Sequence, residues 1–146
     1  MSEVDPPSRR IGAVAAGALI ALMAWAGPGV VVSAISSEQS VAAFQTIATE
    51  QLAQMLEHKD FLFVNVHIPY EGEIARTDAF IAFDQVGENL DLLPADKSAP
   101  IVLYCRSGRM SEIAAGELAA LGYNNVSHLA GGMVEWAKGG RELLYK

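Results

Sequence analysis

The chain has 146 residues and a mass of 15.5 kDa, which allows one domain of ordinary size. Its formal charge of −7, from 10 Lys and Arg against 17 Asp and Glu, argues against a protein that binds nucleic acid by neutralising phosphates. The only cysteine, Cys105, excludes an intrachain disulfide and a cysteine-rich zinc site. The mean hydropathy of +0.25 is high for so acidic a chain, and its main source lies near the N-terminus.

An uncharged apolar run spans residues 11–35, and Arg9 and Arg10 precede it. A basic start followed by an apolar segment is typical of an export signal whose N-terminus stays in the cytoplasm. We therefore expect residues 1–36 to be a signal peptide or a transmembrane anchor. A polar linker is expected at residues 37–43.

The Gly-Pro-Gly sequence at residues 27–29 leaves two alternatives open. A helix that ends there is too short for a membrane core of about 30 Å, and the small residues at 32–34 then suit a cleavage site. A helix that kinks at Pro28 and continues is long enough for an anchor. Both alternatives place the domain at residues 44–146 outside the cytoplasm, in the periplasm or on the outer face of the membrane. Membrane contact is expected only through residues 11–35.

In the rest of the chain, short apolar runs alternate with helical patterns, which predicts an α/β fold with a mainly parallel sheet of about five strands flanked by helices. Four strands can be assigned, at residues 61–66, 80–83, 101–104 and 126–129. The runs at 61–66 and 101–104 are the most apolar and are expected in the centre, with the other two shorter or at the edges. Three helices are expected, over residues 50–58, 111–121 and 133–138. Thr49 is the expected N-cap of the first helix, and Gly122 the residue that ends the second.

The strongest chemical signal is the run Tyr104-Cys105-Arg106-Ser107-Gly108-Arg109-Met110-Ser111. An apolar strand leads into Cys105, a glycine turn follows, and a helix is expected to begin near Ser111. This order brings backbone N–H groups and a helix N-terminus to the sulfur, where they stabilise a thiolate or an anionic adduct. Arg106 and Arg109 concentrate positive charge around the only thiol of an acidic chain, which indicates an anionic substrate. The alternative is that Cys105 is a buried structural cysteine.

This loop resembles the active-site loop of single-domain rhodaneses, the thiosulfate-type sulfurtransferases. The later segment Leu129–Trp136, closed by Gly139-Gly140, is similar to the C-terminal signature of that family. The earlier segment Val64–Ile74 stands where the family carries an Asp-Val-Arg strand end and a Gly-His-Ile-Pro turn. The resemblance covers residues 44–144 and implies a rhodanese-like α/β domain.

Two departures from the family pattern affect the supporting structure. Asn65 and His67 occupy the positions where Asp and Arg are commonest, so a structural ion pair that is usual in the family is expected to be absent. Glu73-Ile74-Ala75 replaces His-Ile-Pro in the loop that follows. Neither departure removes the nucleophile.

The resemblance implies covalent catalysis in two steps, with no metal and no organic cofactor. The Cys105 thiolate attacks thiosulfate or a similar small anionic donor and holds the sulfur as a persulfide, which a thiol or cyanide then removes. The residues expected to bind the donor are Arg106, Ser107, Gly108, Arg109, Met110 and Ser111. The alternative is a non-catalytic rhodanese-like module that carries sulfur or binds a partner outside the cytoplasm.

The spacing argues against a cysteine phosphatase, which needs an arginine as the sixth residue after its cysteine. Ser111 stands there in this chain, and the arginine, Arg109, comes two residues earlier. His67 is interpreted as a hydrogen-bonding loop histidine, and the histidines form no recognisable metal pattern.

Three further side chains are expected to have structural or solvent-exposed positions. Glu71 and Glu73 are interpreted as residues of a solvated loop, and Trp136 as a packing residue that docks the last helix.

Overall fold

The computed structural model describes residues 43–146, so the expected signal peptide or anchor lies outside the described residues. A five-stranded sheet with the order β1-β5-β4-β2-β3 forms the centre of the domain, and every neighbouring pair of strands is parallel. The strands are β1 (Gln45–Ile47), β2 (Leu62–Asn65), β3 (Ala79–Phe80), β4 (Ile101–Tyr104) and β5 (Val126–Leu129). The helices are α1 (Thr49–Glu57), α2 (Arg109–Ala120) and α3 (Gly132–Lys138), with a 3₁₀ turn η1 (Leu90–Leu92). The predicted α/β fold is confirmed.

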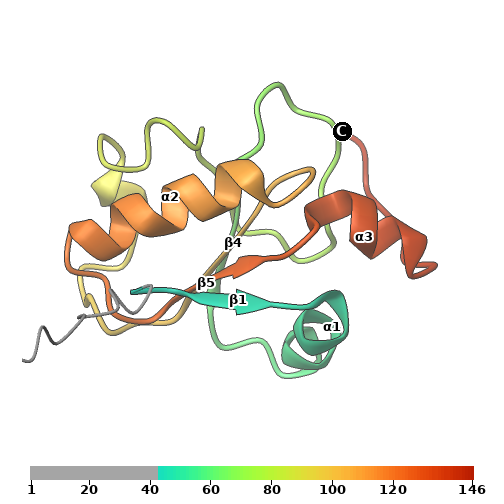
Figure 1. The fold of residues 1–146 in the computed structure, drawn as a ribbon, viewed down its shortest axis with the longest axis horizontal. Coiled ribbons are helices and arrows are strands. Elements are labelled where there is room, and N and C mark those ends of the chain that lie inside the picture. The colour runs from blue at the N-terminus through green and yellow to red at the C-terminus, as the bar shows by residue number, and fades with distance from the viewer. Residues whose placement is uncertain (1–42) are drawn as a thin grey trace, which may run out of the picture. The chain divides into compact units, whose positions relative to one another are not determined.

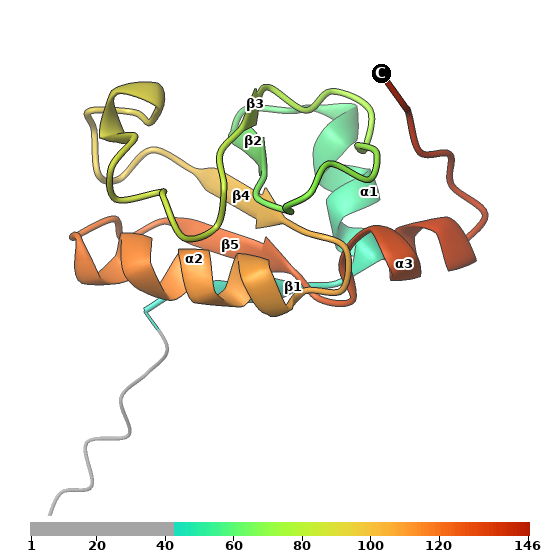
Figure 2. The ribbon, with the colours of Figure 1, turned by 90° about the horizontal axis from the view of Figure 1, so that it is seen from above.

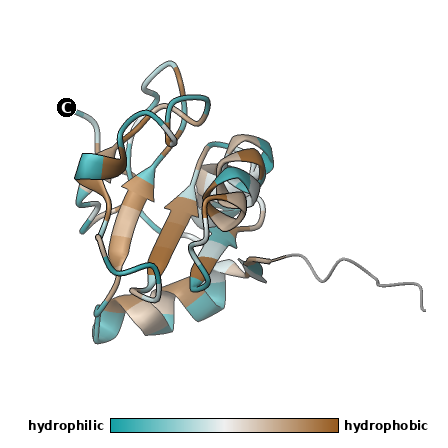
Figure 3. Ribbon diagram, turned by 90° about the vertical axis from the view of Figure 1, so that its left-hand side faces the viewer, coloured by the Kyte–Doolittle hydropathy of each residue, from teal (hydrophilic) through white to brown (hydrophobic). Residues whose placement is uncertain are grey.

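Helices cover both faces of the sheet, and alternate residues of the strands supply two separate cores (Figure 1). In β4, Ile101 and Leu103 pack with α2, whereas Val102 and Tyr104 pack with α1 and α3. The helices α1 and α3 also pack against each other (Figure 2). The central strands are hydrophobic along their length, because both of their faces are covered (Figure 3).

Two strands were predicted with the bounds that the structure shows, β4 and β5. The strand β5 was expected to be shorter or at an edge, and both expectations are wrong. It has four residues, as β2 and β4 have, all of them are buried, and it lies between β1 and β4. The strand expected at 80–83 is shorter and begins at Ala79, and the one expected at 61–66 extends only over β2. The sequence patterns did not indicate β1, which has three residues at the sheet edge, or η1.

The helices agree with their predicted places, with different first residues. Ala48, not Thr49, is the N-cap of α1, and the Thr49 hydroxyl instead contacts the Glu50 carboxylate at 3.1 Å. The helix α2 begins at Arg109, two residues before the expected start, because Gly108 adopts the left-handed conformation that precedes it. Within residues 43–146, no helix combines the length and apolar character needed to cross a membrane.

Tyr104, the last residue of β4, anchors the segment that follows β2. Its side chain is fully buried, and its hydroxyl oxygen accepts the Ile74 N–H at 3.0 Å. The Thr77 hydroxyl donates to the Ile74 carbonyl at 2.6 Å, so the Tyr104 hydroxyl, 2.7 Å away, donates to Thr77. Burial raises the pKa of Tyr104 to about 12.

We expect Tyr104→Phe to lower the free energy of unfolding by about 1–3 kcal/mol, because the buried Ile74 N–H loses its acceptor. Urea denaturation of the purified domain measures this change. Tyr70→Phe is the matched control, since Tyr70 is 39% exposed and its removal is expected to cost less than about 0.5 kcal/mol. Equal effects of the two substitutions would contradict the anchoring role.

The same hydroxyl is expected to make stability depend on alkaline pH. An unfolded tyrosine loses its proton near its ordinary pKa of 10.0, whereas burial raises the pKa of Tyr104 to about 12 in the fold. The unfolded state therefore ionises first, and the free energy of unfolding falls as the pH rises through this interval. The stability difference between wild type and Tyr104→Phe should shrink between these two pH values, and a constant difference would count against the prediction.

Candidate active site

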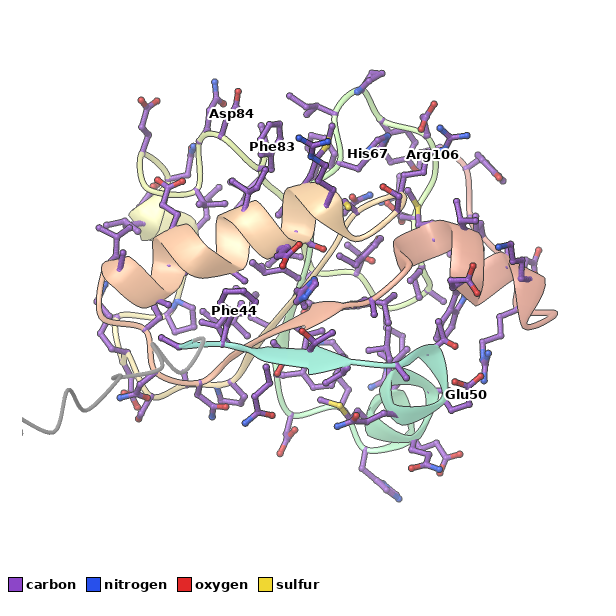
Figure 4. The ribbon with its side chains drawn as sticks, viewed as in Figure 1. Phe44, Glu50, His67, Phe83, Asp84 and Arg106 are labelled. Carbon is purple, nitrogen blue, oxygen red and sulfur yellow. The ribbon has the colours of Figure 1, made fainter. Side chains whose placement is uncertain are left out.

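Three loops meet at the carboxyl edge of the sheet, which is where parallel α/β domains bind ligands. They follow β2, β4 and β5. The register places Asn65 of β2 opposite Tyr104 of β4, so the chain leaves two neighbouring strands at the same level. Figure 4 shows His67 and Arg106 close together beyond the N-terminal end of α2. The candidate site residues predicted from the sequence begin in the loop that follows β4, at Cys105.

Cys105 directly follows β4, and its side chain is 1% exposed. The sulfur accepts the N–H of Gly108 at 3.0 Å. Gly108 has a φ of +98°, a conformation that glycine adopts without the strain of a side chain, and α2 begins at the next residue. The turn therefore brings a backbone donor and the positive end of a 12-residue helix to the sulfur.

The first turn of α3 holds the cysteine loop through two backbone hydrogen bonds. Met133 N–H donates to the Cys105 carbonyl at 2.9 Å, and Val134 N–H donates to the Arg106 carbonyl at 3.0 Å. The C=O and N–H of a trans peptide point in opposite directions, so the N–H groups of Arg106 and Ser107 point away from α3. The N–H groups of α3 thus satisfy the carbonyls of the cysteine loop, and the N–H groups of the loop itself face away from α3.

This close contact requires glycine on both sides. A Cβ at Gly132 would overlap the carbonyl oxygen of Cys105 and would lie 2.7 Å from the carbonyl of Arg106. A Cβ at Gly108 would lie 3.0 Å from the backbone nitrogen of Gly131. The glycine pair after β5 therefore allows α3 to approach the backbone of the cysteine loop.

A chain of hydrogen bonds joins the loop to β5 and β1. The Ser111 hydroxyl donates to the Gly108 carbonyl at 2.9 Å, and its oxygen lies 3.3 Å from His128 Nδ1. His128 Nε2 lies 3.0 Å from the Thr46 hydroxyl. Because Ser111 uses its proton on Gly108, His128 donates from Nδ1 and accepts the Thr46 hydroxyl at Nε2. Burial lowers the pKa of His128, which favours this neutral form.

Asn65 and His67 form contacts of their own in place of the ion pair that the family pattern uses. The Asn65 amide donates to the Gly72 carbonyl and accepts the His67 N–H, each at 3.0 Å. His67 is 7% exposed, and its Nε2 lies 2.7 Å from the Glu71 carboxylate. The interpretation of His67 as a hydrogen-bonding loop histidine is confirmed.

Glu71 also contacts the cysteine loop, which the sequence analysis missed. The carboxylate oxygen that contacts His67 lies 3.3 Å from Arg106 Nε. Glu71 is exposed, as its interpretation as a residue of a solvated loop predicts, but its ion pair with Arg106 was not predicted. No sequence signal connects the two residues, because they lie far apart in the chain and meet only through the register of β2 and β4.

The end of the chain holds the loop after β2 in place. Glu73 and Leu144 exchange two backbone hydrogen bonds of 2.8 Å each. The Lys146 ammonium lies 2.8 Å from the Glu73 carboxylate. The Glu73 side chain is only 12% exposed, so its assignment to a solvated loop is wrong. A Cβ at Gly72 would lie 2.9 Å from the Tyr145 ring, which shows how closely the two segments pack.

The residues predicted to bind the donor lie in one turn around the buried thiol. The exposed ones are Arg106, Ser107 and Arg109, and the buried or half-buried ones are Gly108, Met110 and Ser111. A pocket of about 590 Å³ lies beside this turn, and its lining includes Glu71, Arg106, Met133 and Val134. Trp136 is 7% exposed in the core between α1 and α3, so its predicted packing role is confirmed. Within residues 43–146, no three His, Cys, Asp or Glu side chains are grouped as a metal site would require.

The parallel sheet, the cysteine after its middle strand and the glycine pair that docks the last helix define a class of α/β domains with a single cysteine loop at the carboxyl edge of the sheet. The chain belongs to the rhodanese-like domain family, which matches residues 48–139.

Individual relatives share this domain within chains of different length. A tRNA uridine(34) hydroxylase of Yersinia enterocolitica is 31% identical over 102 residues, which are 66% of this chain and 29% of the relative. The chain thus spans less than a third of that protein. A rhodanese-like domain protein of Staphylococcus aureus is 27% identical with a TM-score of 0.59, and the match covers 70% of this chain and 98% of that one. An NAD-dependent persulfide reductase of A. fulgidus is 28% identical with a TM-score of 0.52, over 64% of this chain and 16% of the reductase.

We expect Gly132→Ala to lower the free energy of unfolding by about 2–4 kcal/mol, because a methyl group would push α3 off the carbonyls of Cys105 and Arg106. Chemical denaturation measures the loss.

Gly140→Ala provides the control for backbone strain. Gly140 also has a positive φ, of +76°, but a Cβ there would meet nothing within 4 Å. We expect this variant to lose only about 1 kcal/mol, the cost of the left-handed conformation alone. If the two variants lose equal stability, the contact at Gly132 does not hold the loop.

Proposed function

We propose that the domain is a sulfurtransferase that moves sulfane sulfur from thiosulfate or a similar anionic donor to a thiol or cyanide, through a persulfide on Cys105. The observation that carries this proposal is the backbone donor at the sulfur, in a loop whose carbonyls are held by α3. Gly108 N–H contacts Sγ at 3.0 Å, and the hydrogen bonds to α3 direct the next N–H groups of the loop away from that helix.

In the first step, the Cys105 thiolate attacks the outer sulfur of thiosulfate. A new S–S bond forms, the S–S bond of the donor breaks, and sulfite leaves with its electron pair. Gly108 N–H, which contacts Sγ, and the N-terminus of α2 stabilise the negative charge of the thiolate and of the persulfide. Arg109, exposed in the first turn of α2, supplies positive charge for the approach of an anionic donor.

In the second step, a thiolate or cyanide attacks the outer sulfur of the persulfide. The S–S bond breaks, the acceptor keeps the sulfur, and Cys105 returns to the thiolate. The pocket beside the cysteine loop supports this step, since Arg106 and the first turn of α3 line it and an acceptor bound there would lie next to the loop. One structural relative is named a persulfide reductase, and this name is consistent with persulfide chemistry at such a domain.

The non-catalytic alternative also has an observation in its favour. The domain corresponds to only 29% of the hydroxylase and 16% of the reductase, so in those proteins it is one part of a longer chain. A sulfur carrier would accept a persulfide from another protein and would not take sulfur from thiosulfate by itself.

Intact-mass spectrometry after incubation with thiosulfate tests the proposal. We expect a gain of one sulfur atom, about 32 Da, that reducing agent removes and that cyanide converts to thiocyanate. Cys105→Ser should show no gain and at least about a 10³-fold loss of thiocyanate formation, because no other thiol exists in the chain. An unmodified wild-type thiol would contradict the enzyme and favour the carrier.

We also propose that residues 11–35 direct the domain out of the cytoplasm, since the run contains no charged residue. Expression of the full chain in a bacterium with a periplasm, followed by fractionation and N-terminal sequencing, tests this. A new N-terminus near Ala34 indicates cleavage, and an intact chain in the membrane fraction indicates an anchor. An intact chain in the soluble cytoplasmic fraction would overturn the proposal.

A further inference from the structure

The cysteine loop carries less positive charge than its two arginines imply. Arg106 Nε lies 3.3 Å from the Glu71 carboxylate, so its charge is balanced by a group on another loop. Arg109 has no carboxylate within ion-pair distance among residues 43–146. The loop therefore carries about one unbalanced positive charge, where the sequence alone indicates two.

The position of Glu71 is fixed from its other side. The oxygen that faces Arg106 also lies 2.7 Å from Nε2 of His67, and His67 is 7% exposed. The backbone N–H of His67 donates to Asn65 at the end of β2, so the ring is attached to the sheet edge. The contact between Glu71 and Arg106 is therefore supported by the fold and does not depend on two mobile side chains alone.

Glu71 shares a pocket with the one residue of the cysteine loop that lines it, Arg106. Glu71 and Arg106 both line the pocket of about 590 Å³ beside the loop. Lys138, the other cation of that lining, is paired with Glu135 at 2.5 Å and so adds little net charge. An anion that approaches the cysteine loop past Arg106 therefore meets a carboxylate as well as a guanidinium.

We infer that Glu71 is a specificity-determining residue, which neutralises Arg106 and makes the site select sulfur donors with a single negative charge over the thiosulfate dianion. This inference rests on the sulfurtransferase function proposed above. The favoured class is that of organic thiosulfonates and the persulfides of small thiols. With a thiosulfonate, the Cys105 thiolate takes the outer sulfur, the S–S bond of the donor breaks, and a sulfinate leaves with the electron pair. Charge is conserved, because one thiolate and one monoanion give one persulfide anion and one sulfinate.

Alkylation of the thiol tests the charge selection without any need for turnover. Iodoacetate and iodoacetamide react with a thiolate by the same displacement and differ by one negative charge. The chain has a single cysteine, so the alkylation of the folded full-length protein reports on Cys105 alone. We expect Glu71→Gln to raise the ratio of the iodoacetate rate to the iodoacetamide rate about threefold at low ionic strength, and the rise to shrink with added salt.

Two further variants separate this effect from a change in net charge or in structure. Glu57→Gln removes the same charge from the exposed end of α1, on the opposite edge of the sheet, and should leave the ratio unchanged. The double variant Glu71→Gln with Arg106→Gln restores the balance of charge and should return the ratio to the wild-type value. A loop that had merely lost its shape would not recover in the double variant.

A comparison of two sulfur donors that differ by one negative charge tests the charge selection in catalysis. We expect Glu71→Gln to raise kcat/KM for thiosulfate by a larger factor than kcat/KM for the methanethiosulfonate anion, which carries one charge less, by about threefold in their ratio. An unchanged alkylation ratio in Glu71→Gln, an equal change in Glu57→Gln, or no alkylation of the native thiol by either reagent would overturn the inference. Normal charge selection in alkylation with no sulfur transfer from any donor would instead refute the proposed function alone.

Discussion

Two backbone hydrogen bonds, from the first turn of α3 to the carbonyls of Cys105 and Arg106, determine the shape of the candidate active site. Backbone polar groups that are buried need partners, and the carbonyls of this loop find theirs in N–H groups that a helix leaves unpaired at its start. The peptide planes of the loop are thereby fixed, and so is the direction of their N–H groups. Gly132 is required because any Cβ there would separate the two backbones.

Successive side chains at the end of β4 point to opposite faces of the sheet, so Tyr104 and Cys105 have different roles. Tyr104 points into the core between α1 and α3 and fixes the segment that follows β2, while Cys105 packs beneath α2 and accepts the Gly108 N–H. The scaffold and the reactive group therefore lie on opposite faces of one strand end. His128 adds a third support, because it holds Ser111 and through it the carbonyl of Gly108.

Local patterns were sufficient to predict the central strands, the approximate helices and the cysteine loop. Continuous apolar runs identify buried parallel strands, and β4 was predicted to the residue. The three residues of β1 are too few to form a pattern, and they form a strand only because β5 offers them a parallel partner. The position of β5 inside the sheet follows from that same pairing. Likewise, the ion pair between Glu71 and Arg106 forms because β2 and β4 are neighbours in the sheet. The order of the strands cannot be predicted from local patterns in one sequence.

The attachment of the chain end to the loop after β2 affects where this domain can be cut. The family match ends at residue 139, whereas the two hydrogen bonds between Glu73 and Leu144 and the ion pair with Lys146 lie beyond it. A fragment that ends at residue 139 would keep Cys105 and the turn that follows it. It would lose the contacts of Leu144 and Lys146 with Glu73, which hold the loop that carries Glu71. The structural unit that contains the site is therefore longer than the family match, because residues 144–146 help to fix the loop that carries Glu71.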